Sequence, residues 1–413
     1  MPGLLLGRLR LHTTSLLAPL EGVSDVGFRA VCHGLGAALT FTEMVRASAL
    51  VRNNAAAWAL IDSHDAATPT GLQLLASTPE ELTAALQALE AAAASGAAPH
   101  LSNLRAIDLN FGCPSPEVLR SGAGPALLHR RSRLRALFRA LVRWREGNGL
   151  GVLAVGAKLR LGLNAGEARA GVFESACASA AEEGLDWVAL HARHAGARSS
   201  APPDWRAFER ARRALEGGAG GGPGRPVLIA NGDVRSLGER DALLRWGAAE
   251  GVMLGRAAMR SPWVFSELLE GEAGGAEAGG ALGEGAARAA AGEARVGGIA
   301  AGRLPGGDAT AGQSPGPPPL PPPPALRWEP PEDGAPQPPV GAWGSGGRWP
   351  SPEQVAAATH TWRSWAAVAG GTRDKHRAFH EENWARLRAL AGAPGEERAL
   401  RHMRLRVPRN GHL

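Results

Sequence analysis

One apolar run in the sequence ends in side chains that could do chemistry. It reads Ile107, Asp108, Leu109, Asn110, Phe111, Gly112, Cys113 and Pro114. The alternating apolar residues predict a buried strand, and the Gly and Pro that follow interrupt it. We therefore expect Asn110 and Cys113 at the rim of a pocket. A thiol with an ordinary pKa near ~8.5 is mostly protonated at neutral pH and can donate a proton. The alternative is a cysteine that only fills space in the core.

Nearly all basic residues of the sequence are arginines rather than lysines. Lysine occurs only at Lys158 and Lys375, and Lys158 lies in a strand-like run with short apolar neighbours. A cation buried in a strand is costly unless it is paired or used. Because arginine is accepted nearly everywhere else, the retained lysine indicates that a compact ammonium group is needed at this position.

Elements that could position these groups alternate through the first 270 residues. Strand-like runs cover 15–20, 39–43, 71–75, 106–111, 152–161, 187–191, 227–231 and 251–254, with helix-like runs between them and a last helix near 259–269. Eight strands alternating with helices over about 260 residues fit a parallel barrel better than a doubly wound open sheet. The sequence thus predicts an α/β fold, a TIM (β/α)8 barrel.

Polar residues gather at the carboxyl ends of these runs, where barrel enzymes build their active sites. They are Pro19, Glu21, Glu43, Gln73, Asn110, Cys113, Lys158, Arg160, His191, Arg193, Asn231, Gly232, Asp233, Gly255 and Arg256. Each residue alone could be structural. Together, the glycines and the helix start after the last two strands predict a phosphate site, to which Arg256 would add a charge-assisted contact.

Composition divides the chain into three parts. Residues 1–270 carry the barrel pattern, whereas 271–350 are rich in Gly, Ala and Pro, with a proline run at 317–324, and predict a disordered insert. Residues 351–413 carry most of the net charge of +6, and we expect a small helical domain there. Such a basic segment is typical of a nucleic-acid partner, although a solvated helical face is the alternative.

The three cysteines, Cys32, Cys113 and Cys177, show no paired spacing. We therefore expect a reducing compartment, the cytoplasm, without disulfides or bound metal. Residues 1–17 could pass for a fragment of a transit peptide, so organellar import stays open if the true start lies upstream. No run approaches the ~20 apolar residues of a membrane span, so we expect no membrane partner.

Several motifs, taken in order, resemble the tRNA-dihydrouridine synthases, flavin enzymes that reduce uridines of tRNA. The resemblance runs from about Leu17 to Phe265. Its motifs cover 18–25 (APLEGVSD), 42–45 (TEMV), 110–114 (NFGCP), 122–124 (GAG), 158–162 (KLRLG), 229–233 (IANGD) and 251–256 (GVMLGR). The 110–114 element, followed by a glycine-rich stretch, is the most specific of them.

The resemblance implies FMN across the top of the barrel. Pro19 would line the isoalloxazine, Gln73 and Lys158 would reach its polar edge, and His191 would lie beside it. The stretches Asn231-Gly232-Asp233 and Gly255-Arg256 would hold the phosphate. A cation at Lys158 would stabilise the negative charge of reduced flavin, which explains why arginine did not replace it.

The resemblance also implies the chemistry. A hydride adds to C6 of uracil and Cys113 donates a proton to C5, while NADPH serves as the reductant. Asn110 would contact the target base, with Glu43, Arg160 and Arg193 also assigned to the substrate. The base must leave its stack, which is easiest in a tRNA loop, here the D loop. We expect a monomer with tRNA and NADPH as partners.

The sequence departs from the family pattern in three places. Glu117 stands where the family usually carries a lysine, the loop 192–203 lacks the usual Gln and Tyr, and Leu20 replaces a common methionine. The first two changes bear on tRNA binding more than on flavin binding. Two alternatives remain open: a flavin reductase of free pyrimidines or other enones, and an RNA-binding homologue without catalysis.

Overall fold

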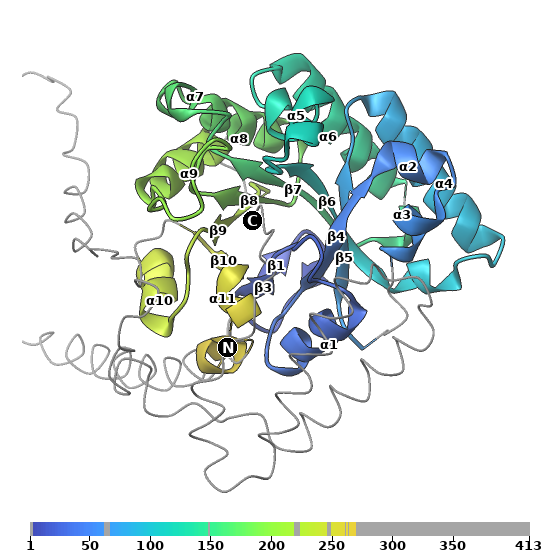
Figure 1. Ribbon diagram of the computed structural model, residues 1–413, viewed down its shortest axis with the longest axis horizontal. Coiled ribbons are helices and arrows are strands. Elements are labelled where there is room, and N and C mark those ends of the chain that lie inside the picture. The colour runs from blue at the N-terminus through green and yellow to red at the C-terminus, as the bar shows by residue number, and fades with distance from the viewer. Residues whose placement is uncertain are drawn as a thin grey trace, which may run out of the picture. The chain divides into compact units, whose positions relative to one another are not determined.

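The computed structural model describes residues 3–269, apart from 62–66, 148, 219–223, 246–248, 261 and 263. Its main feature is a sheet of eight parallel strands in the order β3-β10-β9-β8-β7-β6-β5-β4. The strands are β3 (Ser15–Leu17), β4 (Thr40–Arg46), β5 (Thr70–Leu75), β6 (Leu104–Phe111), β7 (Ala154–Arg160), β8 (Trp187–His191), β9 (Val227–Asn231) and β10 (Gly251–Leu254). Sequential strands lie side by side around the sheet, as in a barrel (Figure 1).

The first and last strands of this order, β3 and β4, close the barrel. Leu16 forms a parallel bridge with Leu39. The amide of Leu17 donates to the carbonyl of Leu39 at 2.9 Å, and the amide of Ala38 donates to the carbonyl of Ser15 at 2.9 Å. A sheet that returns to its own first strand has no free edge. The predicted TIM barrel is therefore confirmed for the described residues.

Helices cover the outside of the barrel (Figure 1). The longer ones are α1 (Val26–Gly34), α4 (Pro79–Ala94), α6 (Arg131–Glu146), α8 (Val172–Glu183), α9 (Arg206–Gly218) and α10 (Leu237–Arg245). Helix α6 shows why they pack there, because its Leu134, Phe138 and Leu141 recur at helical spacing and are buried. Helix α4 begins at Pro79. The preceding Thr78 caps it, because its side chain accepts a hydrogen bond from the amide of Glu81.

Short helices follow several strands at their carboxyl ends. They are α2 (Ala47–Val51), α3 (Ala55–Ala59), α5 (Pro116–Arg120), α7 (Ala165–Arg169) and α11 (Arg256–Arg260). Strand β4 extends to Arg46. Glu43 therefore lies within the strand, whereas the sequence pattern predicted it at the end of the strand. The predicted insert at 271–350 and the predicted helical segment at 351–413 lie outside the described residues.

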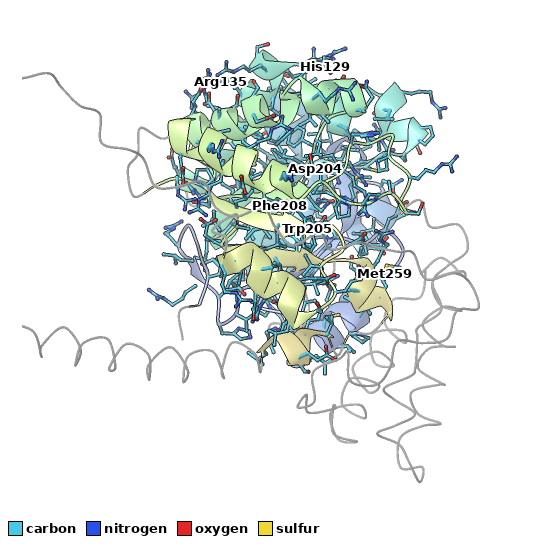
Figure 2. The ribbon with its side chains drawn as sticks, turned by 90° about the vertical axis from the view of Figure 1, so that its left-hand side faces the viewer. His129, Arg135, Asp204, Trp205, Phe208 and Met259 are labelled. Atoms are coloured by element: carbon cyan, nitrogen blue, oxygen red, sulfur yellow. The ribbon has the colours of Figure 1, made fainter. Side chains whose placement is uncertain are left out.

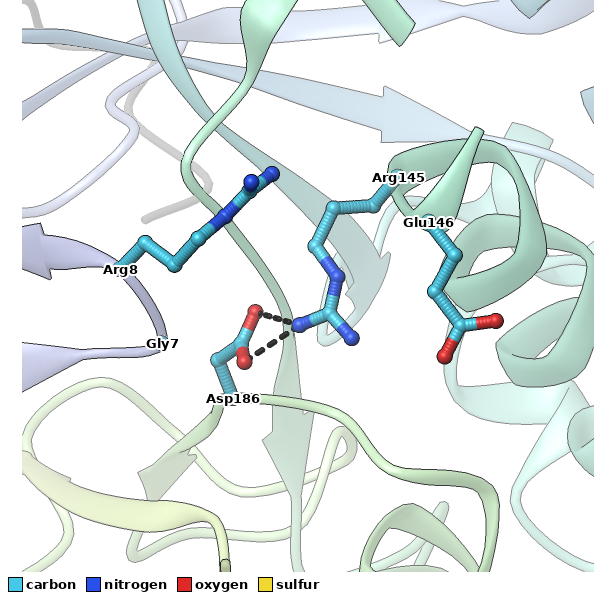
Figure 3. A pocket seen from close by; sticks show the side chains of 5 residues that line it. All are labelled: Gly7, Arg8, Arg145, Glu146 and Asp186. Carbon is cyan, nitrogen blue, oxygen red and sulfur yellow. Dashed lines mark hydrogen bonds and ion pairs between the residues drawn. The ribbon is translucent and has the colours of Figure 1, made fainter. Parts of the chain in front are cut away.

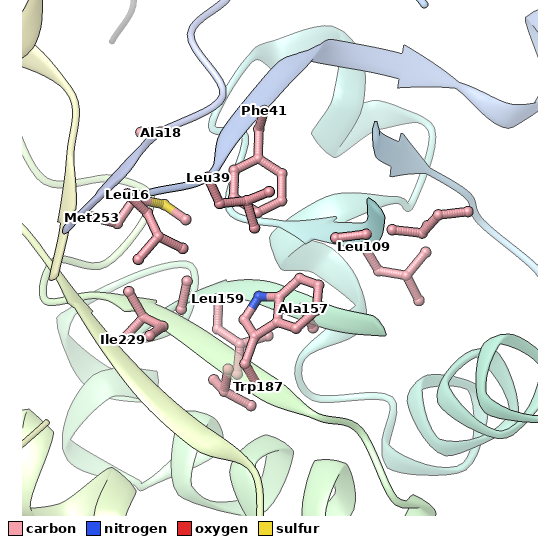
Figure 4. Close-up of a cluster of buried hydrophobic side chains, with 14 of the residues drawn as sticks. Leu16, Ala18, Leu39, Phe41, Leu109, Ala157, Leu159, Trp187, Ile229 and Met253 are labelled. Carbon is pink, nitrogen blue, oxygen red and sulfur yellow. The ribbon is translucent and has the colours of Figure 1, made fainter. Parts of the chain in front are cut away.

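Large aromatic side chains fill the barrel interior below its mouth, and glycines make room for them. A Cβ on Gly156 would lie 2.2 Å from ring atoms of Trp187, and one on Gly71 would lie 2.5 Å from the ring of Phe41. The two rings lie 6.2 Å apart between centroids. Figure 4 shows them among Leu16, Ile229 and Met253. The interior is thus a packed core up to the level of the polar residues.

A small hairpin of β1 (Leu5–Leu6) and β2 (Leu9–Arg10) lies at the opposite end of the barrel and was not predicted. Its Arg8 amide donates to the carbonyl of Leu153, just before β7. Gly7 lies so close to Asp186 that a Cβ would be 2.6 Å from the carboxylate carbon. Figure 3 shows Asp186 paired with Arg145 beside a pocket of about 310 Å³. In the described part of the chain, no helix is long and apolar enough to cross a membrane.

Candidate active site

Strand register arranges the polar side chains of the interior in rows. Asp108 of β6 pairs with Gly156 of β7, and Asn110 pairs with Lys158 one row nearer the carboxyl ends. Residues two apart in a strand share a face. A further row at the mouth joins Arg160, His191 and Asn231 across three strands. The rows thus place Asp108 deepest, Asn110 and Lys158 above it, and the third row at the rim.

Three side chains of the two lower rows form a continuous set of hydrogen bonds, which we call the amide relay (Asp108, Gln73 and Asn110). The Nε2 of Gln73 donates to Oδ2 of Asp108 at 2.6 Å, and the Nδ2 of Asn110 donates to Oε1 of Gln73 at 2.8 Å. The Oδ1 of Asn110 then accepts from the backbone amides of Gly112 at 3.0 Å and Cys113 at 2.9 Å. The relay therefore ends on the backbone that carries the thiol.

Asp108 is fully buried, and sequence reasoning did not assign it to the site. Burial raises the pKa of its carboxyl group to about 7, although the hydrogen bond from Gln73 and the charge of Lys158 favour the ionised form. The carboxylate oxygen Oδ1 and the indole Nε1 of Trp187 have no hydrogen-bond partner of good geometry, although Trp187 also favours the ionised form of Asp108. The available signal was an acid inside an apolar strand, which is rare unless its charge is paired or used.

Lys158 lies in the row above Asp108 and is a perturbed base. Burial lowers the pKa of its ammonium group to about 8, and the neighbouring charge of Arg160 adds to this, while Asp108 and the thiol of Cys113 oppose it. An amine with a pKa near neutrality, within a cluster of polar groups, is typical of functional sites. The sequence-based choice of Lys158 thus coincides with a strongly perturbed group.

Cys113 differs from the other two cysteines in its surroundings. Cys32 and Cys177 are buried, whereas Cys113 is partly exposed and free. Its loop is held from below by Asn110 and from the side by Arg160, whose Nε donates to the carbonyl of Gly112 at 2.6 Å. Burial and the charge of Arg193 lower the pKa of Arg160 to about 10. The thiol is thus presented at the mouth, within electrostatic reach of two cations.

His191 at the end of β8 is held neutral. Burial lowers its pKa well below the usual value, and four cations add to this: Arg160, Lys158, Arg193 and Arg256. The Nη1 of Arg193 lies 3.3 Å from Nε2 of His191. Because a guanidinium group can only donate, Nε2 must accept, and the ring proton lies on Nδ1. His191 therefore presents a neutral N–H donor in a positively charged mouth.

Asp233 gathers two of these cations. Its carboxylate oxygens pair separately with Arg193 and Arg256. Arg193 also donates to the carbonyl of Ala201 at 2.6 Å, and Arg256 donates to the carbonyl of Ser199 at 2.7 Å. Both arginines thus fasten the loop after β8, the same loop that departs from the family pattern. The sequence predicted Asp233 beside a phosphate, and in the structure its carboxylate pairs with Arg193 and Arg256.

The ends of β9 and β10 are shaped by glycine and by one amide. Asn231 donates to the carbonyl of Met253 at 2.7 Å, which ties β9 to β10. Gly232 has φ +131°, which disfavours any side chain, and its carbonyl accepts from Nε1 of Trp205 at 3.0 Å. Trp205 directly precedes α9 and is labelled in Figure 2. A Cβ on Gly255 would lie 3.4 Å from Leu20, so backbone rather than side chain faces the mouth here.

The remaining predicted residues line the other side of the mouth. Glu43 is buried, and its Oε2 accepts from the amide of Gly22 at 2.7 Å, which fixes the loop after β3 that contains Pro19. Glu117, the reversed charge, forms an ion pair with Arg46 at 2.9 Å and is 75% exposed. The structure therefore brings all fourteen predicted cofactor, substrate and catalytic residues to one end of the barrel. Asp108, in the same row as Gln73, is a polar residue that sequence reasoning missed.

Comparisons with known proteins identify the family to which this chain is similar. Residues 16–278 match the family described as dihydrouridine synthase (Dus). A probable tRNA-dihydrouridine synthase of Mycobacterium tuberculosis (strain CDC 1551 / Oshkosh) is 32% identical over 274 residues, which cover 65% of this chain and 64% of the relative. A tRNA-dihydrouridine(47) synthase of Cryptococcus neoformans is 29% identical over 264 residues, 64% of this chain and 35% of the relative.

The chain thus spans less than two thirds of the length of these two relatives. Among solved structures, morphinone reductase in complex with tetrahydroNAD matches with a TM-score of 0.44 and 15% identity, over 64% of this chain and 89% of that chain. The family match covers more than half of the chain and includes every element of the barrel from β3 onward. This chain belongs to the dihydrouridine synthase family.

Proposed function

We propose that the protein is an FMN-dependent tRNA-dihydrouridine synthase that reduces uridine to 5,6-dihydrouridine in the D loop of tRNA, with NADPH as reductant. The observation that carries the proposal is the mouth of the barrel. There a partly exposed thiol lies within electrostatic reach of Lys158 and Arg160. Membership of the dihydrouridine synthase family supports the same reaction.

The residues of the mouth fit a flavin phosphate cofactor. Four cations act on His191, and of these Arg193 and Arg256 are fastened by Asp233 at the ends of β8 and β10. Together with the backbone at Gly232 and Gly255, Arg256 suits a phosphate group, and Arg193, which the sequence assigned to the substrate, pairs with the same carboxylate. Lys158 and the N–H of His191 suit the electron-rich ring system, with Pro19 and Gln73 nearby. When bound and reduced by NADPH, FMN would supply the hydride.

Cys113 supplies the proton in this proposal. Reduction of the C5=C6 bond of uracil needs a hydride at C6 and a proton at C5, and the thiol S–H provides that proton and leaves as thiolate. Lys158 and Arg160 lie within electrostatic reach of the sulfur. The thiolate then regains a proton from solvent, to which the partly exposed Cys113 has access.

Asn110 determines how the base is held. Its carbonyl oxygen accepts two backbone amides, and one of its two N–H groups is donated to Gln73. One N–H remains, so Asn110 can donate a single hydrogen bond to the base and suits a carbonyl oxygen of uracil. Uracil offers such an oxygen at both C2 and C4, whereas C4 of cytosine carries an amino group instead.

The test combines cofactor content with activity on RNA. Purified protein supplied with FMN should retain flavin, and with NADPH it should form dihydrouridine in unmodified tRNA. Cys113→Ala should retain flavin and lose product formation by about 100-fold or more, because general acid catalysis contributes about 10²–10⁴-fold. Cys177→Ala, at a buried cysteine of α8, is the matched control and should keep the activity.

Two outcomes would overturn the proposal. Turnover of free uracil without turnover of tRNA would instead support a reductase of small pyrimidines. Tight tRNA binding without NADPH-dependent reduction of bound flavin would support a non-catalytic RNA-binding homologue. Mapping of dihydrouridine in tRNA from cells with and without the gene would identify the target position.

A further inference from the structure

We propose that Asp108 is a positioning residue that fixes the loop carrying Cys113 through the amide relay. Asp108 reaches the thiol loop by two intervening side chains, Gln73 and Asn110. Its importance for the reaction rests on the proposed function. Its effect on the loop does not, because that effect follows from the hydrogen bonds alone.

The lower end of the amide relay allows one orientation of Gln73. An ionised carboxylate can only accept hydrogen bonds. Gln73 must therefore turn its NH₂ group to Asp108, as the Nε2–Oδ2 distance of 2.6 Å shows, and its carbonyl oxygen faces away. The oxygen then meets the Nδ2 of Asn110 at 2.8 Å. Hydrogen-bond acceptance by Asp108 thus sets the direction of the first two bonds.

The upper end of the relay requires the same orientation independently. Backbone N–H groups can only donate, so the amides of Gly112 and Cys113 need the oxygen of Asn110. The NH₂ group of Asn110 must then face Gln73, which has to present its oxygen. Fixed donors at one end and a fixed acceptor at the other therefore leave a single arrangement for both amides.

Removal of the acceptor would release this arrangement. Gln73 and Asp108 are 1% and 0% exposed, so an NH₂ group of Gln73 without Asp108 would be left in the core without water. A buried donor without a partner is costly, and Gln73 would rotate to find another one. Asn110 would then lose its partner, and the loop at Cys113 would lose one of its two side-chain supports, the other being Arg160.

Two variants at position 108 separate hydrogen-bond acceptance from charge and volume. Asp108→Asn keeps an oxygen that can accept from Gln73, whereas Asp108→Leu keeps the approximate volume and removes every acceptor. The control is Thr70→Val, which removes a buried hydroxyl that donates to the carbonyl of Thr68 at 3.0 Å on the same strand as Gln73. Thermal unfolding of each full-length protein reports whether it is folded.

The first measurement is the rate at which iodoacetamide alkylates Cys113 in the FMN-supplied protein, followed by mass spectrometry of the peptide. Cys32 and Cys177 are buried and serve as internal references for the folded state. The rate should change by about 5-fold or more in Asp108→Leu and stay within about 2-fold in Asp108→Asn and Thr70→Val, since a displaced loop alters access to the thiol. This measurement does not depend on the reaction.

The second measurement is dihydrouridine formation on tRNA. Asp108→Leu should lose about 10- to 100-fold in kcat with little change in KM, because a group that orients a reacting residue has effects of this size. Asp108→Asn should recover most of the rate. If wild-type protein does not reduce tRNA, the proposed function fails, while the alkylation rates still decide the positioning role.

A variant at Gln73 covers the case in which Asp108→Leu does not fold. Gln73→Leu breaks the relay at its centre and should change the alkylation rate of Cys113 as Asp108→Leu does. Unchanged alkylation in both Asp108→Leu and Gln73→Leu would overturn the proposal. Equal losses in Asp108→Asn and Asp108→Leu would also overturn it.

Discussion

At the scale of single residues, two opposite charges share the interior of the barrel one row apart. Burial raises the pKa of Asp108 to about 7 and lowers the pKa of Lys158 to about 8. Each group is displaced towards its neutral form because the low dielectric disfavours both charges, and each partly offsets this for the other. Because both pKa values lie near neutral pH, the protonation states of the pair respond to small changes in their surroundings. This suits groups that lie beside a reacting base.

The raised pKa of Asp108 predicts a pH dependence of stability. The folded state binds a proton near pH 7, whereas an unfolded aspartate with the ordinary value of 3.8 does not, so the stabilising contribution is complete below about pH 4 and is lost as pH rises through 7. The groups acting on Asp108 are Gln73, Lys158 and Trp187. Lys158 stays protonated below its own pKa of about 8.

Urea unfolding of wild type and Asp108→Asn at pH 5 and pH 7.5 tests this. The stability of wild type relative to the variant should fall between the two pH values, whatever the constant offset between the proteins. A difference that stays the same at both pH values would show that Asp108 titrates normally in the folded protein.

Replacement of Lys158 should change the properties of the bound flavin rather than the stability of the fold. Lys158→Met removes the cation but retains a long side chain, so the negative charge of reduced flavin should lose its stabilisation. We expect a more negative midpoint potential of bound flavin and NADPH reduction slowed by about 100- to 1,000-fold, as for other lost electrostatic contacts. Ser15→Ala, at a buried hydroxyl of β3, is the control. An unchanged potential would contradict the assignment of Lys158 to the flavin edge.

At the scale of elements, the barrel interior packs by placing large aromatic side chains against glycines on neighbouring strands. Trp187 of β8 faces Gly156 of β7 in register, directly beside Asp108 of β6. Phe41 and Gly71 repeat the arrangement on β4 and β5. These two aromatic rings form the floor on which the polar rows lie, so the shape of the site depends on two glycines that leave room for the rings.

Gly156→Ala should therefore destabilise the fold. Its Cβ would lie 2.2 Å from the ring of Trp187, and overpacking of a core costs about 1–3 kcal/mol. Gly217→Ala in α9 is the matched control, because nothing lies within 4 Å of its Cβ and alanine favours a helix, so the sign should reverse. Urea midpoints of both variants measure this. Equal effects would show that the contact with Trp187 is relieved by movement of the ring.

The sequence allowed the strand order and the residues of the mouth to be predicted, because both follow from repeated local patterns. Residues such as Lys158 and Cys113 were unusual for their surroundings. Asp108 was missed because its role depends on side chains of two other strands, which no local pattern contains. The hairpin at β1 and β2 was missed because two-residue strands are too short to show alternation. Glu43 was placed at a strand end because the run after it, Met44-Val45, was too short to extend the pattern.

At the scale of the whole barrel, the described residues divide stability and chemistry between its two ends. The carboxyl end carries the thiol, the cations and the relay. The opposite end carries the hairpin over Asp186, which accepts from Arg145 and from the backbone amide of Val155 at 2.7 Å. Barrels commonly show this division, since loops at the carboxyl end do the chemistry and the other end holds the strands together.

Two substitutions remove one carboxylate at each end of the barrel, Asp186→Ala and Asp233→Ala. The first should therefore affect stability, and the second should affect flavin binding and the reaction. Loss of Asp186 leaves Arg145 and the Val155 amide unpaired in a largely buried position and should cost about 3 kcal/mol of stability, with kcat unchanged at a temperature where the protein is folded. Loss of Asp233 frees Arg193 and Arg256 and the loop they fasten, so flavin affinity and kcat should fall by more than about 10-fold. Urea unfolding and flavin titration on both variants measure the two effects. A fall in kcat for Asp186→Ala in the folded protein would mean that the two ends are coupled through the strands.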